Sequence, residues 1–418
     1  MPDRVVETPS GPVSRTRVVF SMQQLQGDDL IVVEKFRGIG WAVLLAGVVS
    51  LTSCAGWPPQ PAGVGAAISW DKLPGWQVDR LAEAWPALLR SCSKIRGRDA
   101  AWRELCLDAD WMYTPDDASA RAFFERHFRP HPLFGEGGEP EGLITGYYEP
   151  LLQGSLTRTE RFRYPLYRRP DNLLTVDLGS LYPELQGKPV RGRLQGNRVV
   201  PYFSRAEITA GDQLLAGQEL LWVDDAVALF MLQVQGSGRV TLPDGSVLAV
   251  GYADQNGHPY FPIGRRLVEM GALKPGEVTL YSIRDWLRNH PNEAEGVLNR
   301  NPSYIFFALR DASLDGPIGS LNVPLVPQRS IAVDASMIPL GTPVWLDTTL
   351  PGGTQPYQRL MQAQDTGGAI KGQVRADVFF GRGDEAERLA GEMKQAGRLY
   401  VLLPWVSSTV DASSVTAQ

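Results

Sequence analysis

Residues 364–381 read QDTGGAIKGQVRADVFFG, and this stretch decides how the rest of the chain is interpreted. The apolar run before it is typical of a strand and ends in Asp365. Gly367 and Gly368 follow almost at once, and a second strand-like run then contains Asp377. Glycines beside Asp365 leave its carboxyl group uncovered and let a bulky polymer approach. We therefore predict two strands whose loops face one cleft, with Asp365 as the catalytic residue.

A third aspartate, Asp334, ends the strand-like run in IAVDASMIPLGT, residues 331–342. Aspartates at strand ends often cap turns by accepting backbone N–H groups. For Asp334 and Asp377 we favour this turn-capping role. The alternative is a supporting role in which a nearby negative charge raises the pKa of Asp365.

The composition is that of a soluble globular protein rich in turns. The chain has 418 residues, is 43% hydrophobic and 21% charged, and carries a formal net charge of -5. Mixed charges give no broad basic face, so no nucleic-acid partner is expected. The 43 glycines and 32 prolines favour a mainly β fold. The four histidines and three cysteines lack zinc-ligand spacing, so we expect no metal and no cofactor.

The N-terminal region predicts secretion and lipidation. Lys35 and Arg37 precede an apolar run, 39–49, of the length of a signal-peptide core. The run closes in Leu-Thr-Ser-Cys at Cys54, which resembles the lipobox of bacterial lipoproteins. The alternatives are an uncleaved anchor or a buried free cysteine. Because residues 1–33 are unusually polar for such a region, we also expect that translation starts later, near Met22, Val32 or Val33.

Lipidation of Cys54 leaves Cys92 and Cys106 as the remaining cysteines. In an oxidising periplasm these two can form a disulfide across a short loop. Two buried thiols are an equally open alternative, because sequence does not give their geometry.

Apolar spacing predicts helices first and strands afterwards. Helical periodicity covers 76–107, and Asp116 or Asp117 is expected to cap a helix over 118–128. From Gly142 onward the pattern predicts short strands, among them 201–208 and 227–240, with a hairpin turn at 243–245 and a helix over 282–290. A late helix capped by Asp384 and ending near Gly397 is expected to precede a last strand, 398–403.

Several long motifs together resemble one known family. The stretch that contains Asp365 resembles the 3D domain, which is named for three aspartates. The family of membrane-bound lytic murein transglycosylase A shows similar motifs in the same order, from roughly 142 to 404. The matching stretches are LITGYYEPLL (143–152), LQVQGSGRVTLPDG (232–245), VGYADQNGHPY (250–260), NPSYIFF (301–307) and RSIAVDASMIPLGTPVWL (329–346).

The resemblance implies a mainly β fold, namely a double-psi β-barrel domain with an inserted second β domain, a few N-terminal helices and a groove for a glycan strand. The implied boundaries are a signal peptide (1–53), a tether (54–69), a barrel domain (70–161 and 298–405, with the 3D motif at 330–403), an inserted domain (162–297) and a disordered tail (406–418). It also implies an outer-membrane lipoprotein that faces the periplasm. The expected partners are peptidoglycan glycan strands, the outer membrane through the lipid anchor, and proteins of wall synthesis.

The implied activity is that of a peptidoglycan lytic exotransglycosylase. Such enzymes cleave the β-1,4 bond between N-acetylmuramic acid and N-acetylglucosamine and leave 1,6-anhydromuramic acid ends. The family's single catalytic aspartate, which acts as acid and then as base, falls on Asp365.

The candidate substrate-binding residues are polar, aromatic or glycine. Adjacent tyrosines in a strand point to opposite faces, so one of Tyr147 and Tyr148 is expected in the core and the other on a sugar face. Neutral hydrogen-bonding side chains suit N-acetyl and hydroxyl groups, although a β-hairpin with a glycine bulge explains the same stretch equally well. The full set is Tyr147, Tyr148, Gln233, Gln235, Ser237, Gly367 and Gly368.

Two competing functions remain open at this point. A glycan hydrolase on the same barrel needs a second carboxylate, for which Asp377 and Glu149 are the candidates. A non-catalytic wall-binding module needs none. Product analysis by mass separates these readings, since an anhydro end is one water lighter than a reducing end.

Overall fold

The computed structural model describes residues 62–187, 190–211 and 213–405. The predicted signal peptide, residues 54–61 of the predicted tether with Cys54, and the predicted disordered tail lie outside these residues. Within them, no helix is long and apolar enough to cross a membrane.

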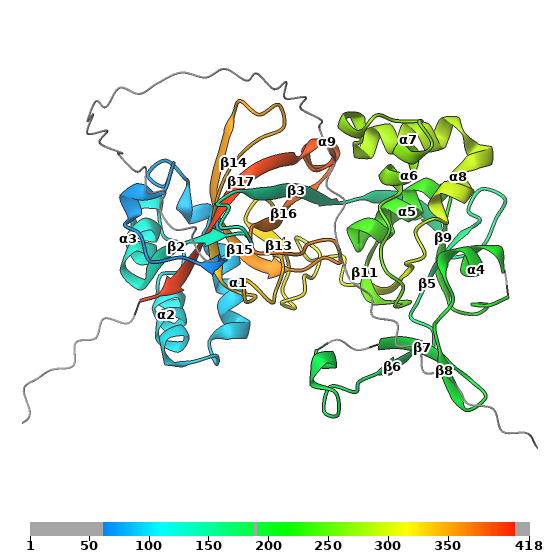
Figure 1. Cartoon of the computed structure of the whole chain (residues 1–418), viewed down its shortest axis with the longest axis horizontal. Coiled ribbons are helices and arrows are strands. Elements are labelled where there is room, and N and C mark those ends of the chain that lie inside the picture. The colour runs from blue at the N-terminus through cyan, green and yellow to red at the C-terminus, as the bar shows by residue number, and fades with distance from the viewer. Residues whose placement is uncertain (1–61, 188–189, 212, 406–418) are drawn as a thin grey trace, which may run out of the picture. The chain divides into compact units, whose positions relative to one another are not determined.

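The larger sheet of the described chain contains eight strands in the order β1-β2-β17-β14-β15-β13-β16-β3 (Figure 1). Residues 394–397 of β17 also pair with 142–145 of β3, so β17, β14, β15, β13, β16 and β3 form a closed circuit. This circuit confirms the mainly β fold predicted for the two flanks of the chain. The bounds are β1 (Gly63–Val64), β2 (Phe128–Phe134), β3 (Gly142–Glu149), β13 (Ser330–Val333), β14 (Pro343–Thr349), β15 (Pro356–Asp365), β16 (Arg375–Arg382) and β17 (Lys394–Pro404).

Three N-terminal helices cover one side of this circuit, as the helical spacing predicted. They are α1 (Trp85–Ile95), α2 (Ala100–Trp111) and α3 (Asp117–His127), and the side chain of Asp116 caps α3. Their apolar faces share a core with strand residues such as Trp345 and Leu402. A disulfide joins Cys92 of α1 to Cys106 of α2, with a Cα–Cα distance of 5.4 Å.

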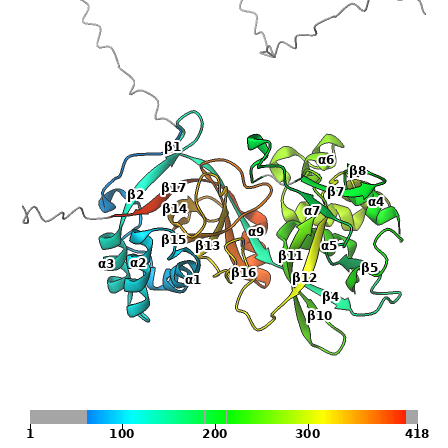
Figure 2. The same cartoon turned by 90° about the horizontal axis from the view of Figure 1, so that it is seen from below.

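A second sheet has the strand order β12-β11-β10-β4-β9-β5 (Figure 2). A small sheet, β6-β7-β8, is formed by residues that lie between β5 and β9 in the sequence. The strands that build the second sheet run from 151 to 310, a longer stretch than the predicted insert 162–297. Their bounds are β4 (Leu151–Ser155), β5 (Tyr164–Tyr167), β6 (Leu174–Val176), β7 (Val190–Gln195), β8 (Arg198–Val200), β9 (Glu219–Val223), β10 (Ser237–Thr241), β11 (Val247–Gln255) and β12 (Ile305–Arg310).

Helices accompany this second sheet in larger number than predicted. α5, α6, α7 and α8 lie close together (Figure 1) and share one apolar core. The helix over 282–290 is confirmed as α7, and the hairpin at 243–245 is confirmed by the antiparallel pairing of β10 with β11. The bounds are α4 (Arg205–Ala210), α5 (Ala226–Gln235), α6 (Ile263–Glu269), α7 (Leu280–Asn289) and α8 (Pro291–Leu298).

Three element predictions are wrong. Residues 201–208 and 227–240 were expected as strands, but they contain α4 and α5. Ser204 and Asp225 accept backbone N–H groups as N-caps of these two helices, which is the local reason that they start there. The late helix, α9 (Asp384–Glu392), is capped at Gly383 rather than at Asp384, and it ends five residues before Gly397 because β17 begins at Lys394.

Candidate active site

Asp365 and Asp377 lie in one row across neighbouring strands of the barrel. Ala332 of β13 pairs with Asp365 of β15 on one side and with Asp377 of β16 on the other. Asp377 in turn pairs with Thr145 of β3. Residues that pair across a sheet project from the same face, so the small side chain of Ala332 separates two carboxyl groups.

The carboxyl group of Asp365 accepts hydrogen bonds at both oxygens. The Tyr147 hydroxyl donates to Oδ2 over 3.0 Å. The backbone N–H and the hydroxyl of Ser320 both donate to Oδ1, each over 2.9 Å. The Ser320 hydroxyl also lies 2.7 Å from that of Thr366. The Asp365 side chain is therefore oriented on one side by a strand residue and on the other by a loop.

Burial raises the pKa of Asp365 above its ordinary value, although hydrogen bonds from Ser320, the Thr366 backbone N–H and Tyr147 act in the opposite direction. Burial, rather than the charge of Asp377, is the main cause. The residue is nevertheless partly exposed, so its carboxyl group is within reach of a bound molecule. A reachable acid with a raised pKa is the arrangement that general acid catalysis requires.

Neither tyrosine offers an open ring to a sugar. Tyr147 is 8% exposed and Tyr148 is 5% exposed. The ring of Tyr147 packs on Phe379 with a centroid distance of 5.3 Å. Burial, together with the neighbouring Asp365, raises the pKa of the Tyr147 hydroxyl far above neutral, so it remains a proton-bearing donor. The expected stacking role is thus replaced by a hydrogen bond from Tyr147 to the catalytic candidate.

The other two aspartates differ in environment. Burial raises the pKa of Asp377 to about 6, against the effect of a hydrogen bond of 2.6 Å from the Thr145 hydroxyl. Asp334 accepts from the backbone N–H groups of Ser336, over 3.1 Å, and Gly372, over 3.0 Å. Although burial acts to raise it, these hydrogen bonds and that of the Ser336 hydroxyl hold the pKa of Asp334 below its usual value. Asp334 is arranged as a turn cap that fixes the glycine loop.

The glycines near Asp365 have unequal steric freedom. A Cβ atom at Gly368 would meet nothing within 4 Å, whereas one at Gly367 would lie 2.8 Å from Ile370. The tightest position is Gly319, where a Cβ would lie 2.6 Å from the Gln364 carbonyl oxygen and 3.4 Å from the Asp365 Cβ. Close approach of backbone to Asp365 is therefore required at Gly319 and not at Gly368.

The remaining predicted residues lie away from Asp365. Gln235, the last residue of α5, accepts a hydrogen bond of 3.0 Å from the backbone N–H of Tyr148. Gln233 lines a cavity of the second sheet, and Ser237 begins β10. Among the described residues none of the three is hydrogen-bonded to Asp365. Glu149, the alternative second carboxylate, is buried and bound to Arg239 over 3.2 Å.

Ser320 and Thr145 were missed by sequence reasoning. Ser320 precedes Asp365 by 45 residues and lies in a loop with no periodicity, so only the folded chain brings it to the carboxyl group. Thr145 is identified only once the parallel pairing of β3 with β16 is known. In the described part of the chain, no group of three or more His, Cys, Asp or Glu side chains is arranged to hold a metal ion.

Comparison with known proteins gives consistent results. Residues 143–308 match the model of the MltA specific insert domain, and residues 329–403 match that of the 3D domain. A curated relative in Escherichia coli strain K12, named membrane-bound lytic murein transglycosylase A, is 37% identical over 352 residues, which is 82% of this chain and 84% of the relative.

Solved structures agree with this match. MltA from Neisseria gonorrhoeae superposes with a TM-score of 0.69 at 36% identity, over 83% of this chain and 98% of that one. Escherichia coli MltA with bound chitohexaose gives a TM-score of 0.64 at 29% identity, over 83% and 96% of the two chains.

Proposed function

Because the chain belongs to the membrane-bound lytic murein transglycosylase A family, we propose that it cleaves the β-1,4 bond between N-acetylmuramic acid and N-acetylglucosamine and leaves a 1,6-anhydromuramic acid end. Members of this family act on peptidoglycan. The partner that we propose is therefore a peptidoglycan glycan strand, and the chitohexaose bound by Escherichia coli MltA supports a glycan as ligand.

One observation carries the proposal: Asp365 combines partial exposure, a raised pKa and fixed donors on both oxygens. A glycan that covers Asp365 excludes water and raises its pKa further.

The proposed reaction moves one proton out and one back. Asp365 donates its proton to the glycosidic oxygen as the bond to the anomeric carbon of N-acetylmuramic acid breaks. The C6 hydroxyl of the same sugar then attacks that carbon and forms the anhydro ring. The resulting carboxylate of Asp365 takes the proton that this hydroxyl loses, so the enzyme returns to its starting state. The Tyr147 and Ser320 donors stabilise the carboxylate while it is charged.

A single carboxylate is sufficient because the attacking oxygen belongs to the substrate. A tethered hydroxyl in good orientation reaches effective molarities of about 10⁵ M or more. It therefore competes well with bulk water for the anomeric carbon. Glu149 is held by Arg239 and is not free to activate water. Asp377 lies beyond Ala332 in the same row, and it remains the residue that a two-carboxylate hydrolase would use.

We place this activity at the periplasmic face of the outer membrane, with Cys54 as the lipidated residue and with proteins of wall synthesis as further partners. The lipobox-like order of basic, apolar and cysteine-containing segments supports this placement. Replacement of Cys54 by Ser, followed by membrane fractionation and metabolic labelling with a fatty acid, tests it.

The function is tested by incubating purified murein sacculi with the chain and with Asp365→Asn. We expect the unaltered chain to release muropeptides with anhydro ends, and Asp365→Asn to bind sacculi while its turnover falls by at least about 10³-fold, in the range lost with a general acid. Asp244→Asn, in the exposed hairpin turn, is the matched control. Reducing ends in place of anhydro ends would establish a hydrolase, and full activity of Asp365→Asn would remove Asp365 from the mechanism.

A further inference from the structure

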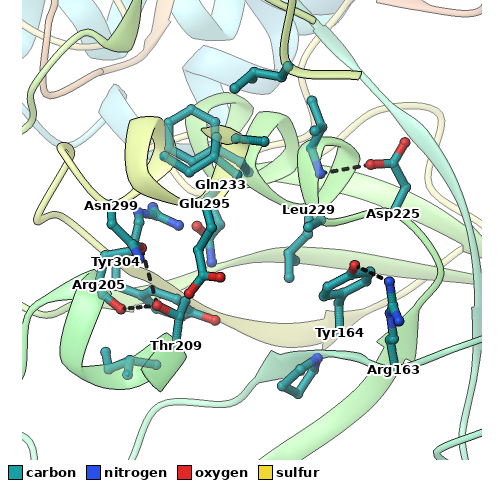
Figure 3. A pocket seen from close by; sticks show the side chains of 18 of the residues that line it. Arg163, Tyr164, Arg205, Thr209, Asp225, Leu229, Gln233, Glu295, Asn299 and Tyr304 are labelled. Atoms are coloured by element: carbon teal, nitrogen blue, oxygen red, sulfur yellow. Dashed lines mark hydrogen bonds between the residues drawn. The ribbon is translucent and has the colours of Figure 1, made fainter. Parts of the chain in front are cut away.

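A cavity of about 770 Å³ lies within the part of the chain that surrounds the second sheet, apart from the Asp365 row. Its wall is formed by α4, α5, β5, α7 and α8, and its size is within the range of small-molecule sites, about 300–1,000 Å³. Figure 3 shows Arg205, Thr209, Glu295 and Asn299 on one side of this cavity and Arg163 and Tyr164 on the other. The mechanism proposed above uses none of these side chains.

The inner wall holds an unsatisfied hydrogen-bonding group. Gln233 of α5 is 5% exposed, and its Oε1 atom has no hydrogen-bond partner among the described residues. Leaving such a buried acceptor unpaired is unfavourable. An N–H donor of a bound molecule would satisfy it.

Arg205 provides a buried positive charge beside Gln233. Its guanidinium donates to the carbonyl oxygens of Asn301, over 3.0 Å, and Ser303, over 2.7 Å. It also stacks on the ring of Tyr304 at 5.1 Å from the centroid. The guanidinium also lies over the ring of Phe230, at 4.6 Å from the centroid. No carboxylate lies within ion-pair distance of Arg205 in the described chain, so these residues leave its charge without a counter-ion.

The rim of the cavity adds charges of both signs. Arg158 is exposed and has no ion-pair partner within the described residues, and the same is true of Glu295 on α8. In contrast, the rim residues Asp225 and Arg288 neutralise each other over 2.8 Å. Within the described chain, the lining charges without an ion-pair partner are thus three guanidinium groups, of Arg158, Arg163 and Arg205, and the carboxylate of Glu295.

We propose that this cavity binds a short peptide that carries carboxylate groups, amide N–H groups and a free amino group. Arg205 and Arg158 bind the carboxylates, Glu295 binds the amino group, and the Gln233 carbonyl accepts an amide N–H. Stem peptides of peptidoglycan have this chemistry, and the identification of the peptide with the substrate rests on the proposed function. A peptide-free glycan of N-acetylglucosamine lacks both charges and fits these groups less well.

The cavity is connected to the Asp365 row through α5. Gln233 lies two residues before Gln235, whose side chain holds the backbone N–H of Tyr148. The neighbouring Tyr147 donates to Asp365. A peptide seated against Gln233 therefore contacts the same helix that positions the strand of the catalytic candidate.

Titration calorimetry of the full chain in detergent, with the tetrapeptide L-Ala-γ-D-Glu-meso-diaminopimelate-D-Ala as the probe, tests the proposal. We expect binding, and we expect Glu295→Gln and Gln233→Leu each to weaken it by about tenfold or more, the effect of one hydrogen bond to a charged or buried group. Glu293→Gln is the matched control, since Glu293 is exposed on the same helix and does not line the cavity. Glu295 lies at the surface, so its variant tests the idea even if Gln233→Leu does not fold.

Three results would overturn the proposal. The first is that the tetrapeptide does not bind. The second is that Glu295→Gln and Gln233→Leu bind it as tightly as the unaltered chain. The third is that an N-acetylglucosamine hexasaccharide displaces the peptide, which would make the cavity a glycan site. Asp365→Asn is expected to retain peptide binding, so a failure of the catalytic proposal and a failure of this one are observed separately.

Discussion

Tyr147 has a different task from the one that its aromatic ring suggests. The ring is buried against Phe379, and the hydroxyl is the group that contacts Asp365. Because the pKa of this hydroxyl lies far above neutral, Tyr147 donates to Asp365 at every working pH. Such a donor favours the charged carboxylate and so opposes the effect of burial on the pKa of Asp365.

Removal of this donor by Tyr147→Phe is expected to raise the pKa of Asp365. A hydrogen bond to a charged group contributes about 1.5–3 kcal/mol, which corresponds to roughly one to two pKa units. Asp365 then stays protonated to higher pH, so the alkaline limb of the kcat/KM profile should move upward by about one unit. The measurement is turnover of a soluble glycan between about pH 5 and pH 8, where protein stability tends to be maximal.

Tyr148→Phe is the control for this shift, because the Tyr148 hydroxyl interacts with Glu387 and not with Asp365. Its alkaline limb should coincide with that of the unaltered chain. An unmoved limb in Tyr147→Phe would mean that the hydrogen bond to Asp365 has no effect on the acid that is titrated.

Asp377 is expected to affect stability in a pH-dependent way. Burial raises its pKa from 3.8 to about 6, so the folded state disfavours the charged form. Well below pH 3.8 the carboxyl group is protonated in both states and costs nothing. Stability is lost as the pH rises from 3.8 through about 6. Asp377→Asn stays neutral and can still accept the Thr145 hydrogen bond. It should therefore be more stable than the unaltered chain at pH 8, by roughly 1–2 kcal/mol given partial exposure, and the difference should shrink to a small fraction of this at pH 4, close to the unfolded pKa.

Urea unfolding of both proteins at these two pH values measures the difference. Asp171→Asn, at an exposed position without a side-chain hydrogen bond among the described residues, is the matched control for the substitution itself. Equal stabilities of Asp377→Asn and the unaltered chain at pH 8 would contradict the raised pKa.

At the scale of elements, the helix α5 shows why pattern reasoning failed in part. Its buried positions run almost without interruption from 227 to 233, so the helix is apolar on all sides and lacks the one-sided stripe that identifies an amphipathic helix. The sequence did contain end signals. Asp225 accepts two backbone N–H groups at the start, and Gly236 adopts a φ of +79° at the end. Read together, these caps favour a helix over a strand.

The candidate site, like the fold, was predicted only in part from the sequence. Asp365 was identified because its setting in sequence is local: a strand end followed by glycines. Ser320, Thr145 and the hydroxyl role of Tyr147 depend on contacts between residues from 45 to 232 positions apart, and no local pattern encodes such contacts. Family resemblance supplied the proposed position of the acid, whereas the surroundings of Asp365 came only from the folded chain.

The loop that carries Ser320 gives the prediction at this scale. Gly319 allows this loop to lie against β15, since a Cβ there would meet the Gln364 carbonyl oxygen at 2.6 Å. Gly319→Ala should displace the Ser320 donors from Asp365. We expect a stability loss of about 1–3 kcal/mol, typical of overpacking, and a fall in kcat/KM. Thermal unfolding and glycan turnover measure these two effects.

Gly276→Ala is the matched control. A Cβ at this position would meet nothing within 4 Å, and Gly276 is exposed and distant in sequence from Gly319 and Asp365. Gly368→Ala also has free space, so its fold should be unaffected, and any loss of turnover there reports contact with glycan. Normal turnover in Gly319→Ala would show that the Ser320 donors are dispensable.

At the scale of the whole described chain, two sheets are joined by few polar contacts. Arg284 of α7 forms an ion pair with Glu387 of α9, and Gln235 of α5 holds the backbone of β3. Arg239 of β10 binds Glu149 at the end of β3. Because the second sheet takes in β4 and β12, we propose that the inserted domain runs from about 151 to 310, with these contacts at its border.

The pair of Arg239 and Glu149 tests both this border and the catalytic assignment. Arg239 also donates to the carbonyl oxygens of Ala312 and Leu314, each over 2.8 Å. The side chains of Arg239 and Glu149 are 12% and 3% exposed, so Arg239→Met leaves a buried carboxylate without a partner. Such a change costs about 3–5 kcal/mol, and Glu149→Gln combined with Arg239→Met should recover a large part of it. Urea unfolding of the two single variants and the double variant gives this coupling.

Glycan turnover of the same variants distinguishes a structural role of Glu149 from a catalytic one. If Glu149 only braces the two sheets, Glu149→Gln lowers the midpoint of unfolding while kcat, measured well below that midpoint, changes by no more than about threefold, because no interaction specific to the transition state is lost. If Glu149 were the second carboxylate of a hydrolase, kcat would fall by about 10²-fold or more in a fully folded protein. That fall would also require Glu149 to exchange its bond with Arg239 for a water molecule, and the burial of both side chains argues against such an exchange.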